Sequence, residues 1–241
     1  MIAIILAAGY GTRLGALTLN TAKPLLAVAG KPILDHIVEK VQNLSGISQI
    51  YVVTNQKFYA AFASWAAQQK NSSITIVNDG TLSNEDRLGS IGDIQFVIEK
   101  ESIRDDVLII GGDNLFNDDL RTFLSFFQAK GSSVMFHDVK SISVAKNLGI
   151  AALDQEQRII SFVEKPASPP STLASTLIYA LQREHLPFVK KALNEGKADR
   201  AGDFIKYLAD RKPIFGQILN GKWFDIGTPE SLVEAEEAFR R

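Results

Sequence analysis

The sequence predicts an α/β fold in which a mainly parallel β-sheet is covered by helices on both faces. Short apolar runs of strand length, such as Ile2–Leu6 and Val107–Ile110, recur along the first half of the chain. Such runs contain almost no polar residue, which is typical of strands buried on both faces. Between them, apolar residues recur at helical spacing. A chain of 241 residues, 46% of them hydrophobic, can bury the core that this fold needs.

The expected elements alternate up to about residue 140 and then change character. Strands are expected at 2–6, 50–54, 74–77, 107–110 and 133–136, and helices near 34–44, 58–66, 91–98 and 120–127. Gly149–Leu153 and Ile159–Val163 flank five polar residues, which predicts an antiparallel hairpin. Residues 166–170 are rich in proline and serine and predict a loop, and helical patterns return at 185–194 and 202–210. The last helix is expected to begin at Thr228-Pro229, with threonine as its N-cap.

We therefore predict one domain over residues 1–241. Its core is expected at about 1–140, and about 141–241 adds the antiparallel elements and the C-terminal helix. The net charge of −1 and the lack of a long basic run argue against nucleic acid and anionic membranes as partners. Cysteine is absent, which excludes disulfides and thiolate metal sites and fits the cytoplasm. The apolar N-terminus lacks a basic leader region and is too short to span a bilayer, so we expect a buried first strand.

A glycine-rich segment follows the first expected strand directly. It reads Leu6-Ala7-Ala8-Gly9-Tyr10-Gly11-Thr12-Arg13-Leu14. Ligands of open α/β sheets bind at the carboxyl ends of the strands, and glycines let backbone N–H groups approach a phosphate. Arg13 and Lys23 can supply positive charge to a triphosphate. The dinucleotide and P-loop patterns do not fit, because Leu14 replaces a required glycine and Ala16 follows Gly15. On spacing alone, a plain glycine-rich turn stays an alternative.

The longer pattern, which continues to Lys23-Pro24-Leu25-Leu26, resembles the signature of the sugar-phosphate nucleotidyltransferases. Three further blocks resemble that family in the same order: Gly111-Gly112-Asp113-Asn114, Glu164-Lys165-Pro166 and Trp223-Phe224-Asp225-Ile226-Gly227-Thr228. The resemblance implies a Rossmann-like three-layer fold with a small antiparallel sugar-binding elaboration. It implies an enzyme that makes an NDP-sugar and pyrophosphate from a nucleoside triphosphate and a sugar 1-phosphate. Homo-oligomerisation stays open.

Two aspartates are the expected metal ligands. Asp113 follows an apolar strand beside the glycine loop, a position that suits Mg²⁺ bound by carboxylates and phosphate oxygens. Asp225 lies just before the capped last helix. The resemblance implies that both chelate the metal, although either aspartate alone could also be a turn or cap residue. The three histidines show no metal-ligand spacing.

The resemblance also assigns residues to the two substrates. It implies that Lys165 contacts the sugar phosphate, that Glu164 contacts sugar hydroxyls, and that Gly149 and Thr176 line the sugar pocket. At residue 177 the family's usual glycine is replaced by leucine, which is expected to narrow that pocket. Residues 89–92 resemble a family stretch that opens a helix near base and sugar. The nucleotide-binding set is therefore Leu6, Ala8, Gly9, Gly11, Thr12, Arg13, Lys23, Asn78, Gly89 and Asp113.

In the implied reaction, an ionised sugar phosphate attacks the α-phosphorus, so positioning and charge stabilisation suffice without a general base. Arg13 and Lys23 are the expected catalytic residues. Residues 112–116 resemble the thymidylyltransferase branch, which favours dTTP or UTP with glucose 1-phosphate. One alternative is a cytidylyltransferase for a non-sugar phosphate alcohol. Another is a regulatory relative that binds a sugar nucleotide without turnover.

Overall fold

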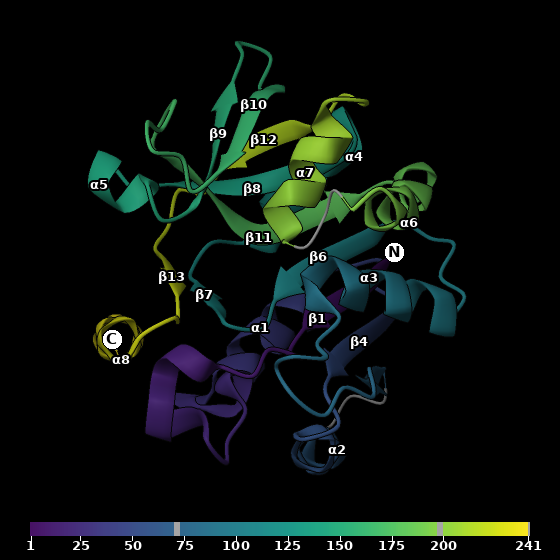
Figure 1. Ribbon diagram of the computed structural model, residues 1–241, viewed down its shortest axis with the longest axis vertical. Helices are drawn as coiled ribbons and strands as arrows, with labels where there is room; N and C mark the ends of the chain where they lie inside the picture. Colours follow the sequence, from purple (N-terminus) through teal and green to yellow (C-terminus); the bar gives the residue numbers. More distant parts are fainter. Residues whose placement is uncertain (70–72, 197–199, 241) are drawn as a thin grey trace.

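A nine-stranded sheet forms the centre of the molecule in the computed structural model, which describes residues 1–69, 73–196 and 200–240 (Figure 1). Four neighbouring strands are parallel, and β1 lies at their centre, with Ile4 opposite both Tyr51 and Ile109. This arrangement confirms the strands expected in the first half. In spatial order the four strands are β6 (Val107–Gly111), β1 (Ile2–Leu6), β4 (Gln49–Thr54) and β5 (Ile74–Asn78).

The second half joins this sheet through a strand that the sequence did not predict. Strand β11 (Leu173–Leu181) is antiparallel to β6, and it also pairs with β8 and β9. The strand expected at 133–136 therefore does not extend the parallel row, because β11 lies between it and β6. The predicted hairpin at 149–163 is confirmed. The remaining strands are β8 (Ser133–Asp138), β9 (Gly149–Leu153), β10 (Ile159–Glu164) and β12 (Phe215–Ile218), which is parallel to β8.

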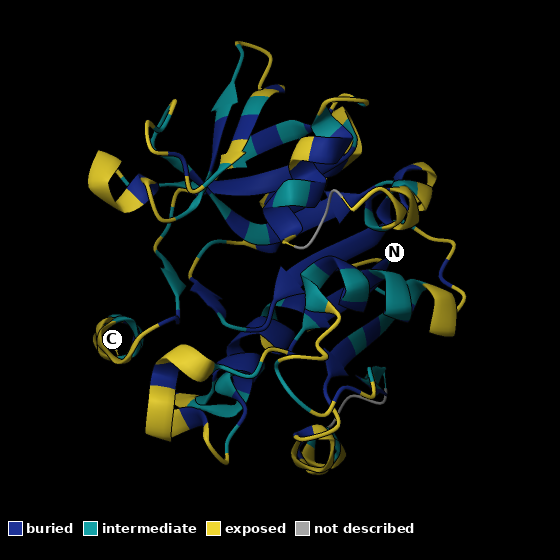
Figure 2. Cartoon of the chain, viewed as in Figure 1, coloured by how far each residue is buried: buried dark blue, intermediate teal, exposed yellow. Residues whose placement is uncertain are grey.

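Helices cover both faces of the sheet and enclose two hydrophobic cores, as predicted for a layered α/β fold. Side chains alternate along a strand, so Ala3 and Ile5 face one core while Ile2 and Ile4 face the other. The strands are buried and the outer helix surfaces are exposed (Figure 2). The first core is covered by α1 (Ile33–Gln42), α2 (Tyr59–Gln68), α4 (Leu120–Lys130) and α8 (Pro229–Phe239), the second by α3 (Gly89–Lys100), α6 (Pro187–Asn194) and α7 (Ala201–Ala209).

Short elements surround the carboxyl ends of β1 and β6. A two-stranded ladder joins β7 to β13, and Thr228 caps α8 through a bond from the Ser231 amide, as its sequence predicted. These elements are the 3₁₀ helices η1 (Thr12–Thr18) and η2 (Lys23–Leu25), the hairpin β2 (Ala27–Val28) with β3 (Lys31–Pro32), β7 (Asn114–Phe116) and β13 (Trp223–Asp225). Two others, α5 (Ile142–Ala145) and η3 (Arg183–His185), lie elsewhere.

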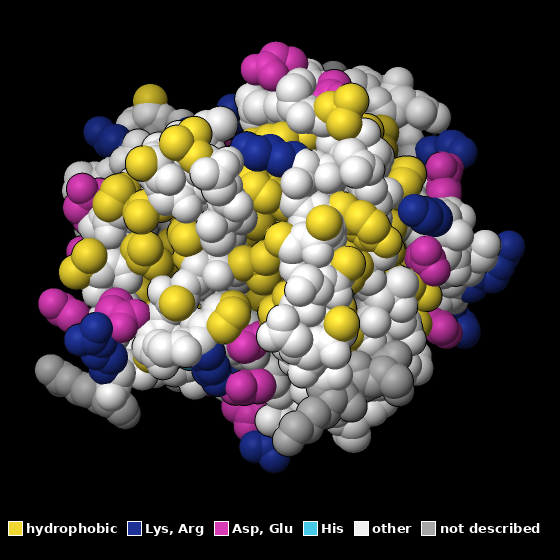
Figure 3. All heavy atoms as spheres, turned by 90° about the horizontal axis from the view of Figure 1, so that it is seen from below, with side chains coloured by type: hydrophobic (Ala, Val, Ile, Leu, Met, Phe, Trp, Pro, Cys, Tyr) yellow, Lys and Arg dark blue, Asp and Glu magenta, His cyan; other side chains and the backbone are white. Residues whose placement is uncertain are grey.

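The surface is mixed in character. Seen from below, hydrophobic side chains are spread over the face, and positive and negative side chains are interspersed mostly toward its edges (Figure 3). Within the described ranges, no helix has the length and apolar character needed to cross a bilayer.

Candidate active site

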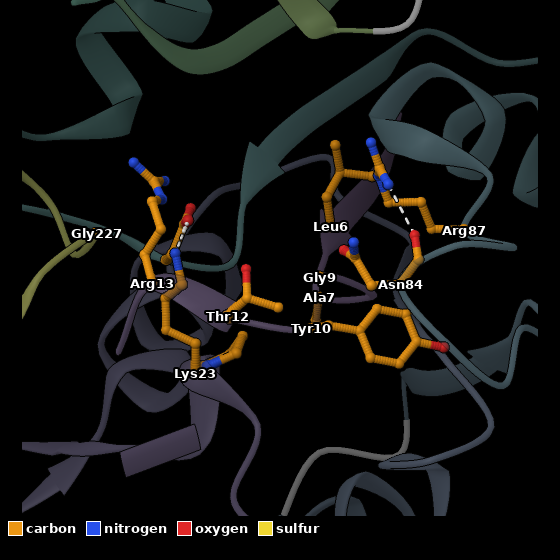
Figure 4. Close-up of a pocket in the computed structure, with 13 residues that line it drawn as sticks. Leu6, Ala7, Gly9, Tyr10, Thr12, Arg13, Lys23, Asn84, Arg87 and Gly227 are labelled. Carbon is orange, nitrogen blue, oxygen red and sulfur yellow. Dashed lines mark hydrogen bonds and ion pairs between the residues drawn. The ribbon is translucent and has the colours of Figure 1, made fainter. Parts of the chain in front are cut away.

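The glycine loop lines a pocket at the carboxyl ends of β1 and β6. Gly11 has a φ of 65°, and a Cβ there would lie 3.0 Å from the Thr18 side chain. Thr18 in turn donates a hydrogen bond of 2.8 Å to the Gly11 carbonyl, which fixes the turn. A left-handed conformation with so little space requires glycine. The pocket has a volume of about 260 Å³ and is lined by Leu6, Ala7, Gly9, Tyr10, Gly11, Thr12, Arg13, Lys23, Pro24, Asn84, Arg87, Asp113 and Gly227 (Figure 4).

Two basic residues reach this pocket from neighbouring 3₁₀ segments. Lys23 Nζ donates to Asp113 Oδ2 at 2.7 Å, and the lysine side chain is only 12% exposed. Arg13 is exposed and points up from the loop at the side of Lys23 (Figure 4). A Cβ on Gly227 would lie 3.4 to 3.5 Å from the Arg13 guanidinium, so the arginine side chain lies against this glycine. With Arg87 from the loop before α3, three cations and one carboxylate line the pocket where the sequence predicted phosphate binding.

Asp113 and Asp225 are brought together by the β7–β13 ladder. Asp225 pairs with Asn114, the residue after Asp113, and the Ile226 amide donates to the Asp113 carbonyl at 3.1 Å. Burial raises the pKa of Asp225, and the charge of Asp113 raises it further, while Lys23 and Arg13 oppose the shift. A cation between the two carboxylates would relieve this repulsion. Within the described residues no three His, Cys, Asp or Glu side chains form a metal-binding group, so a bound ion would need phosphate oxygens and water. This donor set fits Mg²⁺.

A hydrogen-bond chain that the sequence did not single out supports Asp113. The Asn114 amide donates to Asp113 Oδ1 at 3.3 Å and to the Gly111 carbonyl at 3.4 Å. Asn114 is buried, and its oxygen accepts a bond of 2.8 Å from Trp223 Nε1. Both oxygens of the Asp113 carboxylate are therefore oriented by protein donors. The sequence could have indicated this support, because Asn114 and Trp223 belong to the same two motifs as Asp113 and Asp225.

Three predicted sugar residues, Gly149, Glu164 and Thr176, lie on β9, β10 and β11, and Lys165 directly follows β10. Glu164 ends β10 beside Gly149, where a Cβ would lie 2.8 Å from Glu164 Oε1, and a Cβ on Gly202 would overlap the same oxygen. Burial raises the pKa of Glu164. Lys165 is exposed. Gly202 lies in the first turn of α7. The sequence alone did not identify it as a site residue, because only the folded chain brings it to Glu164.

Thr176 and Leu177 lie in an irregular part of β11. Thr176 is buried, and its hydroxyl donates to the Met135 carbonyl at 2.8 Å. Leu177 has a φ of 55°, which a glycine adopts without strain. Its Cδ2 lies 3.4 Å from the place of a Cβ on Gly111. Leu177 therefore stands beside the end of β6, next to Asp113. The narrowing expected from this leucine stays a prediction.

The loop before α3 forms the other wall of the pocket. The Tyr10 hydroxyl and Thr81 Oγ1 are 3.1 Å apart, which ties the glycine loop to this segment. Asn78 bonds Gln56 and the Gly80 amide and does not line the pocket. Gly89 opens α3 with a φ of 74°. Asn84 and Arg87 line the pocket, although the sequence alone left this loop unassigned.

The structure brings together part of the predicted set. Seven predicted residues line the pocket: Leu6, Gly9, Gly11, Thr12, Arg13, Lys23 and Asp113. Asp225 lies beside Asp113 through the ladder, and the buried Ala8 accepts a bond from Asn55 through its carbonyl. The roles of all these residues, and of Asn78, Gly89, Gly149, Glu164, Lys165 and Thr176, stay predictions.

The amino-acid sequence is similar to a protein-family model and to known proteins along nearly its whole length. A family model described as nucleotidyl transferase matches residues 2–241. The chain is 34% identical over 239 residues to a bifunctional protein GlmU of Methanocaldococcus jannaschii, covering 98% of this chain and 54% of that protein. It is 31% identical to a bifunctional protein GlmU of Methanococcus maripaludis, covering 99% and 54%. The chain spans about half the length of these relatives.

The fold of the chain is also similar to that of solved protein structures. A structure from Bacillus anthracis, assigned provisionally as a glucose-1-phosphate thymidylyltransferase and containing sucrose, superposes with a TM-score of 0.86 at 26% identity. The match covers 100% of this chain and 96% of the other. A UDP-glucose pyrophosphorylase in complex with UDP-glucose gives a TM-score of 0.83 at 22% identity and covers 99% and 97%, which supports the fold alone.

Proposed function

The chain belongs to the nucleotidyl transferase family, and we propose that it transfers a nucleotidyl group from a nucleoside triphosphate to a sugar 1-phosphate. One observation carries this proposal: the carboxylates of Asp113 and Asp225 lie together at the strand end where Arg13 and Lys23 face the glycine-loop pocket. Two anionic reactants need this combination, because positive charge must offset their repulsion. The products are an NDP-sugar and pyrophosphate.

The reaction forms one bond and breaks one. A phosphate oxygen of the sugar 1-phosphate attacks the α-phosphorus, and the bond between the α-phosphorus and the bridging oxygen to the β-phosphate breaks. The electron pair leaves with pyrophosphate. No protein base is required, because the attacking oxygen is already ionised. The chain therefore contributes alignment of the two phosphates and stabilisation of the charge that moves to the leaving group.

The described contacts support distinct roles for the basic residues. Arg13 is exposed and makes no ion pair within the described part of the chain, so we assign it to the departing pyrophosphate. Lys23 is held by Asp113 and would contact phosphates close to the reacting centre. Lys165 follows Glu164 in the other half, and we assign it to the acceptor phosphate. Asp113 and Asp225 would hold Mg²⁺, which supplies charge neutralisation when bound.

The proposed acceptor side of the site lies in the second half of the chain. Glu164 lies against Gly149 and Gly202, and we assign its carboxylate to sugar hydroxyls. Leu177 at the edge of the site favours a compact acceptor, and glucose 1-phosphate with dTTP or UTP is the pair that we propose. We expect the reaction to take place in the cytoplasm.

A substrate matrix tests the proposal. Each common nucleoside triphosphate is combined with glucose, N-acetylglucosamine or mannose 1-phosphate, or with phosphocholine, and pyrophosphate release and product mass are measured with Mg²⁺. We expect turnover with a sugar 1-phosphate, fastest with dTTP or UTP. Preference for CTP with phosphocholine would identify a cytidylyltransferase instead. Nucleotide binding without pyrophosphate release from any pair would indicate a regulatory protein.

Asp113→Asn and Asp225→Asn should abolish that turnover. The matched control is Asp210→Asn, because Asp210 is exposed at the C-cap of α7 and pairs with Lys206 at 3.1 Å, outside the pocket. Near-native rates in Asp113→Asn or Asp225→Asn would remove that carboxylate from the active site.

A further inference from the structure

Arg87 is an exposed residue that lines the wall of the pocket. The loop that carries it is stabilised by its own carboxylates: Asp86 accepts the amides of Leu82 at 2.9 Å and Ser83 at 2.7 Å. Arg87 Nη1 donates to the Asn84 carbonyl at 2.7 Å, which orients the guanidinium. The Tyr10–Thr81 contact ties this loop to the glycine loop. Such preorganisation is what a specificity determinant needs.

The pocket has two chemically different sides. Arg13, Lys23 and Gly227 lie on one side, and Arg87, Asn84 and the Tyr10 ring lie on the other (Figure 4). Asp113 belongs to the first side, because it accepts a hydrogen bond from Lys23. The first side combines cations and a carboxylate, which suits phosphates and metal. The second side offers an aromatic ring and hydrogen-bond donors, which suits a flat heterocycle with polar edges. A triphosphate anchored at the first side therefore directs its base toward the second.

Arg87 retains free donors at that side. It makes no ion pair with any described residue, and only Nη1 is bonded, to a main-chain carbonyl. A guanidinium donates hydrogen bonds and accepts none. It therefore matches a base edge that carries a carbonyl oxygen, and it opposes an edge that carries an amino group. At C4 of a pyrimidine or C6 of a purine, uracil, thymine and guanine carry a carbonyl oxygen, whereas cytosine and adenine carry an amino group.

We propose that Arg87 selects nucleotides whose base carries a carbonyl oxygen at C4 of a pyrimidine or at C6 of a purine. The inference rests on the proposed function, because it requires a nucleoside triphosphate in the glycine-loop pocket. It goes beyond that function by naming a residue and a chemical rule for the choice of base.

Equilibrium binding provides the primary test. Calorimetry with the full chain measures the affinity for UTP, dTTP, GTP, CTP and ATP in the presence of Mg²⁺ and the absence of acceptor. The native protein should bind UTP, dTTP and GTP more tightly than CTP and ATP. Arg87→Ala should reduce the preference by roughly five- to 150-fold, the effect of losing a directed contact to a base edge. Binding is measured without turnover, so an inactive protein would overturn the proposed function without affecting this result.

Arg87→Lys separates base recognition from simple charge. Lysine keeps the charge and can still donate, but it lacks the planar fork that fixes the direction of two donors, so base selectivity should recover only in part in this variant. Arg104→Lys is the matched control, because Arg104 is an exposed arginine that does not line this pocket. Equal weakening toward all five nucleotides, restored by lysine, would show that Arg87 contacts phosphate and would overturn the proposal. Unchanged selectivity in Arg87→Ala would overturn it as well.

Discussion

Replacing Asp225 with asparagine should stabilise the metal-free protein while it abolishes turnover. The substitution keeps the shape of the side chain and removes its charge. Burial and the neighbouring charge of Asp113 raise the pKa of Asp225, despite the opposing Lys23 and Arg13. A carboxyl whose pKa is raised by folding destabilises the folded state at any pH above its unfolded value, because it must ionise in an unfavourable place. Without a bound cation, the charge of Asp225 therefore costs free energy.

The repulsion between the two carboxylates sets the size of this effect. Asp225 is paired with the residue next to Asp113, and the charge of Asp113 raises the pKa of Asp225. Two carboxylates at about 5 Å repel by about 3 kcal/mol in a medium of dielectric constant near 20. Attraction to the two cations offsets part of this. We expect Asp225→Asn to gain about 1–3 kcal/mol at pH 8, or roughly 2–10 °C in Tm for a chain of this size. The gain should shrink as the pH falls toward about 4, the ordinary aspartate value.

Thermal unfolding in EDTA at pH 8 and pH 5 measures the gain, with Asp210→Asn as the control for removal of an exposed aspartate. The same scans with Mg²⁺ and a nucleoside triphosphate should raise Tm in the native protein much more than in Asp225→Asn. A lower Tm for Asp225→Asn in EDTA, or an equal response to Mg²⁺, would refute this reasoning.

Other substitutions probe separate parts of the site. Arg13→Ala should lower kcat for pyrophosphate release by on the order of a hundredfold with little change in KM; a raised KM at unchanged kcat would make Arg13 a simple binding residue. Lys165→Ala should raise KM for the sugar 1-phosphate roughly ten- to a hundredfold and leave triphosphate binding nearly unchanged; equal weakening toward both substrates would contradict the division into two halves. Leu177→Gly should widen the range of accepted sugar phosphates, and Leu177→Ala should do the same if the leucine side chain, rather than its backbone strain, limits the acceptor. Burial and the nearby Asp79 raise the pKa of Asp93 to about 8. The free energy of unfolding of the native protein should therefore fall between about pH 4 and pH 8, by up to about 1.4 kcal/mol per pH unit. Urea titrations should show a weaker dependence of this free energy on pH in Asp93→Asn, and the same dependence in both proteins would contradict the raised pKa.

The sequence by itself determined the parallel half of the sheet and its helices. Apolar runs and helical spacing are local properties, so β1, β4, β5 and β6 could be recognised from their own residues. The glycine loop was equally local: a left-handed Gly11 and the cations at 13 and 23 belong to one continuous segment. The hairpin of β9 and β10 and the cap of α8 follow from residues that are close neighbours in the chain.

Tertiary structure alone decided how distant segments meet. Strand β11 separates β6 from β8, and nothing in its own residues specifies that place. Asp113 meets Lys23 across 90 residues, and Trp223 reaches Asn114 across 109. The loop of Arg87 forms a wall of the pocket and is tied to the glycine loop by the Tyr10–Thr81 hydrogen bond. Gly202 adjoins Glu164 only once α7 has packed on β10. Sequence periodicity reports which face of an element is buried, whereas the partner on that face depends on long-range pairing and packing of the whole chain.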